Sequence, residues 1–544
     1  MALRNSTMPL SHAERRSAIR RAWRHPQGPS LRNLPDGLQT KAKGYRDPAL
    51  APPQVGLRDI PVVQFSEDPN SIVTVKVQTI QAPTPNTYQQ TGCFVSFGAT
   101  SIAKGDAAEL TQWNDLEDIL IVAQPAADVT WAAGLVTLTT AAPLPVNYAP
   151  GDTPFMTVAG FVPTGYNYVG PVTIVDTSTF TYPAVTDPGQ TTTVGTYMPQ
   201  SAIEVSQMAT TYFDQGNMTS VWVLELGYGA DSAANATALQ SWLNVNPKVF
   251  CGYLLPRSVG ASETTIEAFR DIFKQYQNPE AMTYFWMTVS ANAITVLDDT
   301  YKCVIQLVEA PAVTDIGKDN ASDPNGEFTM AAMFYNAMAF RPSQINRVAP
   351  MAFKYLYGVT AYPTKNNGPL LKSFKQNATN YVATGAEGGV AYNIVYEGVT
   401  LDGQDYFNWW WTIDWVQINI NLNLSNAIIN GSNNPFAPLY YNQDGINFLE
   451  TNLYNTMLQA STLGMVLGAI TMTTLNQPDL QNNVLLGVFE GLCDVNAVQF
   501  VDYVNANPGH YKIGEYDGLS VLFIPARGFI HIMVSVTATD LVSI

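Results

Sequence analysis

The stretch Ser220-Val-Trp-Val-Leu-Glu-Leu226 is an apolar run of strand length that ends at a glycine-rich turn. Residues 231–244 then have helical spacing, and three more apolar runs follow at 249–255, 282–289 and 303–308. Ser262 is a suitable N-cap for a second helix, whose apolar face is formed by Ile266, Phe269, Phe273 and Tyr276. Strands that alternate with helices of about ten to fifteen residues indicate βαβ units with both faces of the sheet covered. The sequence therefore predicts an α/β core over 219–310.

The chain is long and poor in charge, with 544 residues of which 13% are charged. A single hydrophobic core stops growing at about 250–300 residues, so we expect several domains. Ordinary soluble domains carry about 25% charged residues. A surface with so little charge is typical of proteins that bury much of it in an assembly, although a merely neutral surface has the same composition.

The net charge of −17 is unevenly distributed. Residues 1–50 hold ten Lys and Arg against three acids, whereas the stretch between Lys104 and Lys248 has thirteen acids and no basic residue. An acidic body repels nucleic acid and anionic membranes at neutral pH. No run of eighteen apolar residues predicts a membrane span either. We therefore expect neither nucleic acid nor a membrane as a partner.

The first 55 residues differ from the rest of the chain. They combine Pro-rich sequence with a basic cluster made of Arg15, Arg16, Arg20, Arg21 and Arg24 around Ile19 and Trp23. This segment has too little apolar content for a core. The composition also suits a transit peptide, or an extension upstream of a true start at Met8 or later. We favour a flexible arm, and nothing resembles a secretory signal.

The four cysteines are far apart and lie in apolar runs, at Cys93, Cys251, Cys303 and Cys493. They form no CxxC motif and have no nearby His. We interpret them as buried free thiols in a chain that folds in a reducing cytoplasm. We expect no metal site.

The predicted architecture is a multidomain α/β fold with an inserted small all-β domain and extended β arms at its ends. Short β runs at about ten-residue spacing, separated by Pro, Gly, Asn and Asp, indicate a sandwich or barrel at 126–200. The predicted domains are a basic arm at 1–55, the first strands and the start of the α/β core at 56–125, the insert at 126–200, the α/β core at 201–345, a second α/β domain at 346–517, and a hairpin with a last strand at 518–544.

Further elements are predicted from apolar periodicity and turn residues. The predicted strands are 59–65, 71–80, 91–97, 391–397, 519–524 and 529–537. The predicted helices are a short one at 106–120 and longer ones at 201–213, 328–340, 368–382, 402–424 and 444–463. A glycine-rich turn is expected at 385–389.

Candidate chemical motifs are weak. The turn Gly227-Tyr-Gly229-Ala-Asp-Ser232 lies where a dinucleotide-binding turn would lie, but its third glycine position is Ser232. An ordinary turn capped by Asp231 or Ser232 is the better interpretation. His12 and His25 lie in the arm, and His510 and His531 have no catalytic neighbours in sequence. Three consecutive tryptophans, 409–411, point in different directions on a helix, which favours burial over a sugar-binding platform. We predict no catalytic residue and no cofactor.

The C-terminal half resembles the contractile-tail sheath proteins of phages. The stretches that carry the resemblance are Ala352-Phe-Lys-Tyr-Leu-Tyr-Gly-Val-Thr360, Phe374-Lys-Gln-Asn-Ala-Thr-Asn-Tyr381, Gly398-Val-Thr-Leu-Asp-Gly403, Asp414-Trp-Val416, Pro525-Ala-Arg-Gly-Phe529 and Thr539-Asp-Leu-Val542. Residues 212–226 and 244–257 match earlier in the chain, so the similarity spans about 200–544. The basic segment 1–55 and the insert 126–200 depart from the family.

The resemblance implies a non-enzymatic structural subunit of a virion. Such subunits form hexameric rings that stack helically around the tail tube protein, between the baseplate and the tail terminator proteins. They assemble in the host cytoplasm, and their contraction drives the tube through the host envelope during genome delivery. The resemblance also implies a tube-proximal domain at 346–517 and terminal arms that add strands to the sheets of neighbouring subunits.

The candidate site residues follow from this reading. The inter-subunit strand candidates are Phe529, Ile530, Ile532, Val534 and Val536 at the C-terminus and Val62, Val63, Val73, Val75 and Val77 near the N-terminus. The tube-contact candidates are Lys354, Lys372 and Lys375, because cations are scarce in this chain. Two other functions stay open: a nucleotide-binding enzyme that uses the Gly227–Gly229 turn, and a carbohydrate-binding virion protein that uses Tyr166, Tyr168 and Tyr182 of the insert.

Overall fold

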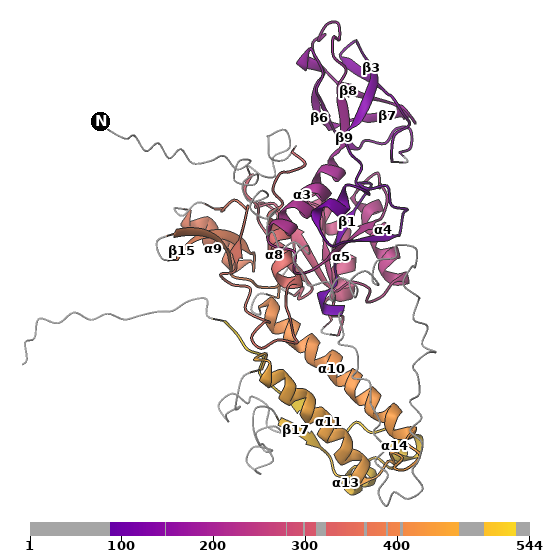
Figure 1. The fold of residues 1–544 in the computed structure, drawn as a ribbon, viewed down its shortest axis with the longest axis vertical. Coiled ribbons are helices and arrows are strands. Elements are labelled where there is room, and N and C mark those ends of the chain that lie inside the picture. Colours follow the sequence, from indigo (N-terminus) through magenta and orange to yellow (C-terminus); the bar gives the residue numbers. More distant parts are fainter. Residues whose placement is uncertain are drawn as a thin grey trace, which may run out of the picture. The chain divides into compact units, whose positions relative to one another are not determined.

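A computed structural model describes residues 88–528, apart from 147, 279, 298–299, 312–322, 364–366, 388–389, 403–405 and 467–493. All of these residues belong to the unit that runs from Asn86 to Ile544. The fold is mixed α/β, with a six-stranded sheet, a seven-stranded sheet, a three-stranded sheet and a two-stranded sheet (Figure 1). The predicted multidomain α/β class is confirmed. The predicted terminal arms and their strands lie outside the described residues.

The six-stranded sheet is built from the apolar runs that the sequence marks. Its strands are β1 (Gly92–Ser96), β2 (Ala107–Leu110), β10 (Val221–Glu225), β11 (Gly252–Leu254), β12 (Tyr284–Thr288) and β13 (Val304–Leu307). Their order is β13-β12-β11-β1-β10-β2, and all neighbours are parallel except β2, which is antiparallel to β10. The chain moves from β1 to β10 on one side and then to β11 on the other, so its winding direction reverses at β1.

Helices cover both faces of this sheet, because alternate side chains of each strand point to opposite faces. Phe94 and Trp286 join the core formed with α3 (Gln200–Asp214) and α8 (Thr329–Met338). Val95 and Phe285 join the core formed with α4 (Ser232–Val245) and α5 (Glu263–Tyr276). Burial on both faces explains why the strands are continuously apolar rather than alternating.

Two local features position these helices. Ser262 caps α5 as predicted, since its side chain accepts a hydrogen bond from the backbone N–H of Thr265. Gly92 and Gly252 permit the close approach of α8, because a Cβ at these positions would lie 2.5 Å and 2.7 Å from ring atoms of Phe334. A side chain at either glycine would push α8 away from the sheet.

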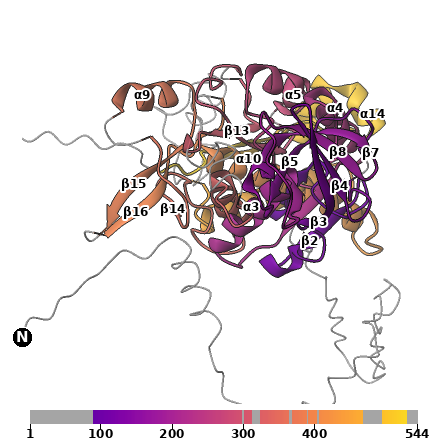
Figure 2. The same ribbon diagram turned by 90° about the horizontal axis from the view of Figure 1, so that it is seen from above.

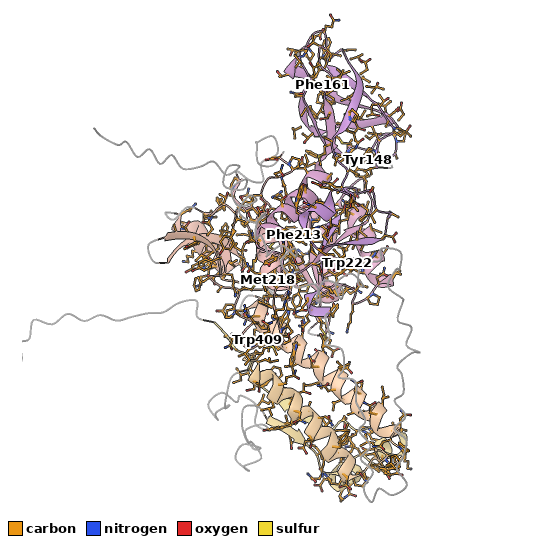
Figure 3. The ribbon with its side chains drawn as sticks, viewed as in Figure 1. Tyr148, Phe161, Phe213, Met218, Trp222 and Trp409 are labelled. Carbon is orange, nitrogen blue, oxygen red and sulfur yellow. The ribbon has the colours of Figure 1, made fainter. Side chains whose placement is uncertain are left out.

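The insert is a seven-stranded antiparallel sheet folded around its own core. Its strands are β3 (Gln124–Ala132), β4 (Leu135–Thr140), β5 (Phe155–Ala159), β6 (Tyr168–Pro171), β7 (Thr173–Asp176), β8 (Thr179–Pro183) and β9 (Thr196–Pro199), in the order β6-β5-β9-β3-β4-β8-β7. A register shift at Ala126 and Asp128 lets β3 pair with β9 and then β4. Phe180 and Tyr197, from the two halves of the sheet, meet edge to face at 5.5 Å. Phe161 lies inside the same core (Figure 3).

The C-terminal half contains two small sheets and a helical pair. The antiparallel strands β14 (Tyr355–Leu356), β16 (Val390–Tyr396) and β15 (Tyr381–Glu387) form one sheet (Figure 2), which α9 (Gly368–Gln376) precedes in the chain. The long helices α10 (Phe407–Ser432) and α11 (Gln443–Thr462) pack along each other (Figure 1). The second small sheet pairs β17 (Asp494–Ala497) with β18 (Leu519–Leu522), and between them lie α13 (Phe500–Ala506) and α14 (Pro508–Ile513).

The prediction of a short helix at 106–120 is wrong. This segment forms the edge strand β2 and the short 3-10 helix η3 (Trp113–Leu116). The open edge of β10 offers backbone partners from Val221 to Leu224, and this tertiary pairing outweighs local helix propensity. The Asp115 carboxylate then accepts backbone N–H donors from Thr111 and Gln112, which holds the turn after the strand.

Predictions around 368–424 also need correction. The helix predicted at 368–382 ends at Gln376, and the residues from Tyr381 onward form β15. Gly385 lies inside that strand opposite Tyr392 rather than in a turn, because pairing with β16 extends the hairpin. The helix predicted at 402–424 begins at Phe407 and continues to Ser432, where its contact with α11 supports the added length. None of the helices in the described ranges combines the length and apolar character that a membrane crossing requires.

Candidate functional site

A cavity of about 770 Å³ opens where the parallel strands of the six-stranded sheet end. Ser96 follows the apolar part of β1, Pro256 and Arg257 follow β11, and Thr288 ends β12; all four residues line the cavity. The winding of the chain reverses at β1, and α/β proteins bind ligands in the crevice outside the carboxyl ends of strands at such a reversal. The cavity is therefore the place in this fold where a ligand site is expected.

An internal carboxylate occupies the backbone donors beside this crevice. Glu225, at the end of β10, is buried and accepts hydrogen bonds from the backbone N–H groups of Gly98, Thr100 and Gly227 at 2.8, 3.1 and 2.7 Å. The hydroxyls of Ser96 and Thr100 donate to the same carboxylate at 2.6 and 2.8 Å. Glu225 thus occupies the N–H of Gly227, the first glycine of the turn, which is therefore not free for a nucleotide phosphate.

The Gly227–Gly229 turn has an ordinary structural role. Asp231 caps α4, because its carboxylate accepts a hydrogen bond from the backbone N–H of Ala234 at 2.7 Å. Gly227 has a φ of 74°, which glycine adopts without strain. A phosphate at this turn would meet the negative charges of both Glu225 and Asp231. The geometry does not favour the nucleotide-binding alternative.

A buried arginine organises the polar side of the cavity. The Arg257 guanidinium donates from Nε to Glu309 at 2.7 Å, from Nη1 to Gln207 at 2.6 Å, and from Nη2 to the carbonyl oxygen of Glu327 at 2.6 Å. It also lies 4.2 Å from the ring centroid of Phe328. These contacts join β11, α3 and the segment before α8. The sequence pattern did not reveal this cluster, because each hydrogen-bond partner lies at least 50 positions from Arg257 in the chain.

Glu204 of α3 also lines the cavity. Burial raises the pKa of its carboxyl to about 7, while the charge of Arg257 opposes this rise and the charge of Glu309 adds to it. Glu204 therefore changes charge near neutral pH. An acid of this kind can bind a cation or exchange a proton.

Of the three consecutive tryptophans, only Trp411 has the predicted burial, whereas Trp409 and Trp410 are half-buried. Trp411 is buried, Lys302 lies 4.8 Å from the ring centroid of Trp410, and Arg527 lies 5.3 Å from that of Trp409. Figure 3 marks Trp409 at the start of α10. One turn further along, the hydroxyl of Tyr284 donates to the Asp414 carboxylate at 2.6 Å. Burial raises the pKa of Asp414 to about 7, and Lys302 and the Tyr284 hydrogen bond oppose the rise. These contacts attach α10 to the six-stranded sheet.

The stretches that resemble sheath proteins meet at a second joint, around Asn380. Its side-chain oxygen accepts the backbone N–H groups of Gly398 and Val399 at 2.7 and 2.9 Å. Its side-chain nitrogen donates to the carbonyl oxygens of Gln306 and Val399 at 3.0 and 2.9 Å. Asn380 thereby ties β13 to the segment that leads into α10. Gly398 has a φ of 76° and packs directly on Ala352, so three of the similar stretches converge here.

The predicted site residues fall into two groups. The inter-subunit strand candidates, Phe529 to Val536 and Val62 to Val77, lie outside the described residues. Of the tube-contact candidates, Lys372 and Lys375 are exposed on α9, and Lys375 lies 3.9 Å from Glu397. Lys354 is half-buried, and burial lowers its pKa. No contact joins the three lysines among the described residues.

The insert tyrosines are not available as a sugar platform. Tyr166 and Tyr182 are buried in the core of the insert, and the hydroxyl of Tyr182 donates to the carbonyl oxygen of Tyr166 at 2.6 Å. The half-buried ring of Tyr168 stacks on Tyr182 at 4.8 Å. Because these rings pack on one another, the structure does not favour the carbohydrate-binding alternative.

A further surface was missed by the sequence reasoning. The helical pair α10–α11 exposes five large apolar side chains, Ile428, Ile429, Phe448, Tyr454 and Leu458. Residues 407–463 contain no Lys or Arg and only three acids. The absence of Lys and Arg from these residues was the sequence signal that could have indicated this surface. Large exposed apolar side chains on a helical pair without cations favour an interaction surface.

The comparisons with known proteins give partial structural similarities. No protein-family model matches the chain, and no curated protein matches it. The crystal structure of a sheath tail protein from Listeria innocua is similar over 69% of this chain and 85% of that protein, with 12% identity and a TM-score of 0.36. A chain of the anti-feeding prophage baseplate is similar over 87% of this chain and all of that chain, with 10% identity and a TM-score of 0.45. Both TM-scores lie below 0.5.

Proposed function

We propose that this protein is a structural subunit of a contractile phage tail sheath, which surrounds the tail tube and contracts to drive it through the host envelope. The observation that carries the proposal is the two-stranded sheet β17–β18. Each of its strands has a single partner strand within the described ranges. A two-stranded sheet is marginally stable in water, and an open edge accepts further strands. The sheet therefore suits strand donation between subunits, with main-chain hydrogen bonds as the link.

Three further features support an assembly subunit. The ordered series of similar stretches from 352 to 542 runs through the joints at Asn380 and Asp414, which connect parts of the fold rather than build a reaction centre. The α10–α11 pair exposes large apolar side chains and contains no Lys or Arg. The chain also carries β-branched terminal segments that suit linking strands. In this proposal 346–517 is the tube-proximal domain, the outer insert is 126–200, and the partners are other copies of the chain, the tail tube protein, and the baseplate and tail terminator proteins.

Electron microscopy tests the proposal directly. Full-length protein mixed with assembled tail tubes should form sleeves of stacked rings around the tubes, which negative staining would show. In this proposal the subunits assemble in the host cytoplasm, and the finished sleeve is part of the virion tail. Discrete particles with bare tubes at high protein concentration would contradict the assignment.

A first structural prediction concerns the insert. Deletion of Ala126 to Gln200, with a short Gly/Ser linker in its place, should leave sleeve formation intact. The insert has its own core, and the chain enters and leaves it through the paired strands β3 and β9, where Gln124 faces Tyr197. Its acidic residues, Asp128, Asp152, Asp176 and Asp187, are accompanied by no Lys or Arg, which suits an outward, solvated position. Loss of sleeves after deletion would place the insert inside the lattice.

A second prediction concerns the tube. Replacing Lys354, Lys372 and Lys375 with Glu should weaken co-sedimentation with tubes at least tenfold and leave self-polymerisation intact, because like charges would face an acidic tube surface. A matched control replaces three exposed lysines elsewhere, Lys104, Lys248 and Lys274, with Glu. Equal tube binding by both triple variants at physiological salt would remove the three candidates from the tube contact.

A further inference from the structure

Two polar oxygens beside the cavity at the strand ends have no hydrogen-bond partner in the described part of the chain. They are Oγ1 of Thr288 and Oδ1 of Asn235, and both residues line the cavity. Thr288 is only 5% exposed. A buried oxygen without a partner loses the hydrogen bond that water would supply, which is costly. Both oxygens can accept a hydrogen bond, so the cavity suits a ligand that brings N–H or O–H donors.

The charges around the cavity favour a cationic ligand. Arg257 is already engaged by Glu309, Gln207 and the Glu327 carbonyl, and its charge is balanced by Glu309. Glu204 lines the same cavity and accepts the backbone N–H of Arg257. When Glu204 is ionised, the group formed by Arg257, Glu309 and Glu204 therefore has a net negative charge. Asp231, exposed at the start of α4, adds to the negative potential.

Aromatic rings form part of the cavity wall. Tyr148 of the insert packs edge to face on Tyr228, with 4.9 Å between ring centroids, and both residues line the cavity. Figure 3 marks Tyr148. Phe97 and Phe155 also line it. Aromatic faces attract planar cations, and arginine-type guanidinium groups stack on them readily.

We propose that this cavity binds a guanidinium group. The five N–H donors of a guanidinium lie in one plane, and Glu204, Thr288 and Asn235 are acceptors among the residues that line the cavity. The volume of about 770 Å³ falls in the range of about 300–1,000 Å³ that ligand cavities have. The group comes either from a free small molecule or from an arginine of a protein chain.

The test uses the full-length chain and N-acetyl-L-arginine amide as the probe, with isothermal titration calorimetry at pH 8. We expect saturable binding that weakens at least tenfold in Glu204→Gln. Thr288→Val should weaken it severalfold, because the methyl group cannot accept a hydrogen bond. Glu117→Gln, at an exposed acid outside the cavity, is the matched control and should bind like the unchanged chain. Circular dichroism confirms that each variant is folded.

Two further measurements keep the proposal testable if Glu204→Gln fails to fold. Binding by the unchanged chain should weaken roughly tenfold from pH 8 to pH 6, since Glu204, with a pKa of about 7, becomes mostly protonated. Arg257 and Glu309, which face Glu204, contribute to that pKa. The uncharged analogue N-acetyl-L-citrulline amide should bind at least tenfold more weakly than the probe. Absence of saturable binding in the millimolar range, or equal affinity for the citrulline compound, would overturn the proposal.

A last comparison distinguishes the two sources. An acetylated peptide amide with one central arginine between glycines should bind more tightly than the probe if the cavity receives an arginine of a protein chain. Equal affinity for the peptide and the probe would assign the site to a free guanidinium compound.

Discussion

A chain that ends at Arg527 should stay folded and monomeric yet form no sleeves around tail tubes. In the removed segment, β-branched apolar residues alternate with a mixed set of side chains. As a strand, it would have one uniformly β-branched apolar face, made of Ile530, Ile532, Val534 and Val536. Such a strand requires a sheet beneath it. The segment follows Gly528 at the end of the chain, and a terminal strand can leave its own domain at little loop-closure cost.

The energy of strand donation is large enough for an all-or-none effect. Several main-chain hydrogen bonds contribute roughly 0.5–1.5 kcal/mol each, and four buried β-branched side chains contribute about 1.5–3 kcal/mol each. The gain exceeds an association and ordering cost of several kcal/mol. The described part of the chain offers an acceptor in β18, whose one paired neighbour is β17. Removing the donor should therefore abolish polymerisation without unfolding the subunit.

The control for the truncation keeps the strand and changes its other face. Ser535→Ala and Thr537→Ala together should assemble normally, because these residues lie opposite the apolar row. Negative-stain microscopy with tubes and near-native circular dichroism are the measurements. Normal sleeves from the truncated chain would rule out a linking role for this strand. Failure to fold would mean that the strand pairs within its own subunit, and the link would then pass to 59–80 or to the basic arm.

Arg257→Ala should lower the free energy of unfolding of the α/β core by about 3–5 kcal/mol, because removing one partner of a buried ion pair leaves the other uncompensated. The side chain of Glu309 is 0% exposed, and its partner Arg257 is 11% exposed. The substitution also removes the donors to Gln207 and to the Glu327 carbonyl. Urea unfolding followed by tryptophan fluorescence would measure the change, since Trp222, Trp242 and Trp286 lie in or against the core.

The matched control is Arg270→Ala on α5. Arg270 pairs with Glu267, with side chains 25% and 44% exposed, and donates to the Val296 carbonyl oxygen at 2.7 Å, so its removal should cost about 1–2 kcal/mol. The loss of unfolding free energy in Arg257→Lys should fall between those of the two alanine variants, because an ammonium cannot donate in the three directions that the guanidinium uses. A loss in Arg257→Ala no larger than in Arg270→Ala would show that water enters and compensates Glu309.

The sequence by itself determined the elements whose signals are local. The apolar runs around Val223, Leu254 and Met287 became parallel strands of one sheet, and Ser262 and Asp231 became helix caps. Each signal lies within about fifteen residues, because side-chain periodicity and capping depend on adjacent turns of the chain. The burial of Trp411 was predictable in the same way, since three consecutive side chains on a helix diverge.

Only the tertiary structure decided β2 and the polar clusters. β2 is a strand because the edge of β10 is open beside it, which no local pattern records. The hydrogen bond from Gly98 to Glu225 spans 127 positions, and that from Tyr284 to Asp414 spans 130. Such partners meet because the strand order and the helix packing bring together residues that are far apart in the chain. An isolated carboxylate or asparagine in the sequence looks the same whether it will be solvated or buried, and the physical difference lies in the partners that the fold supplies.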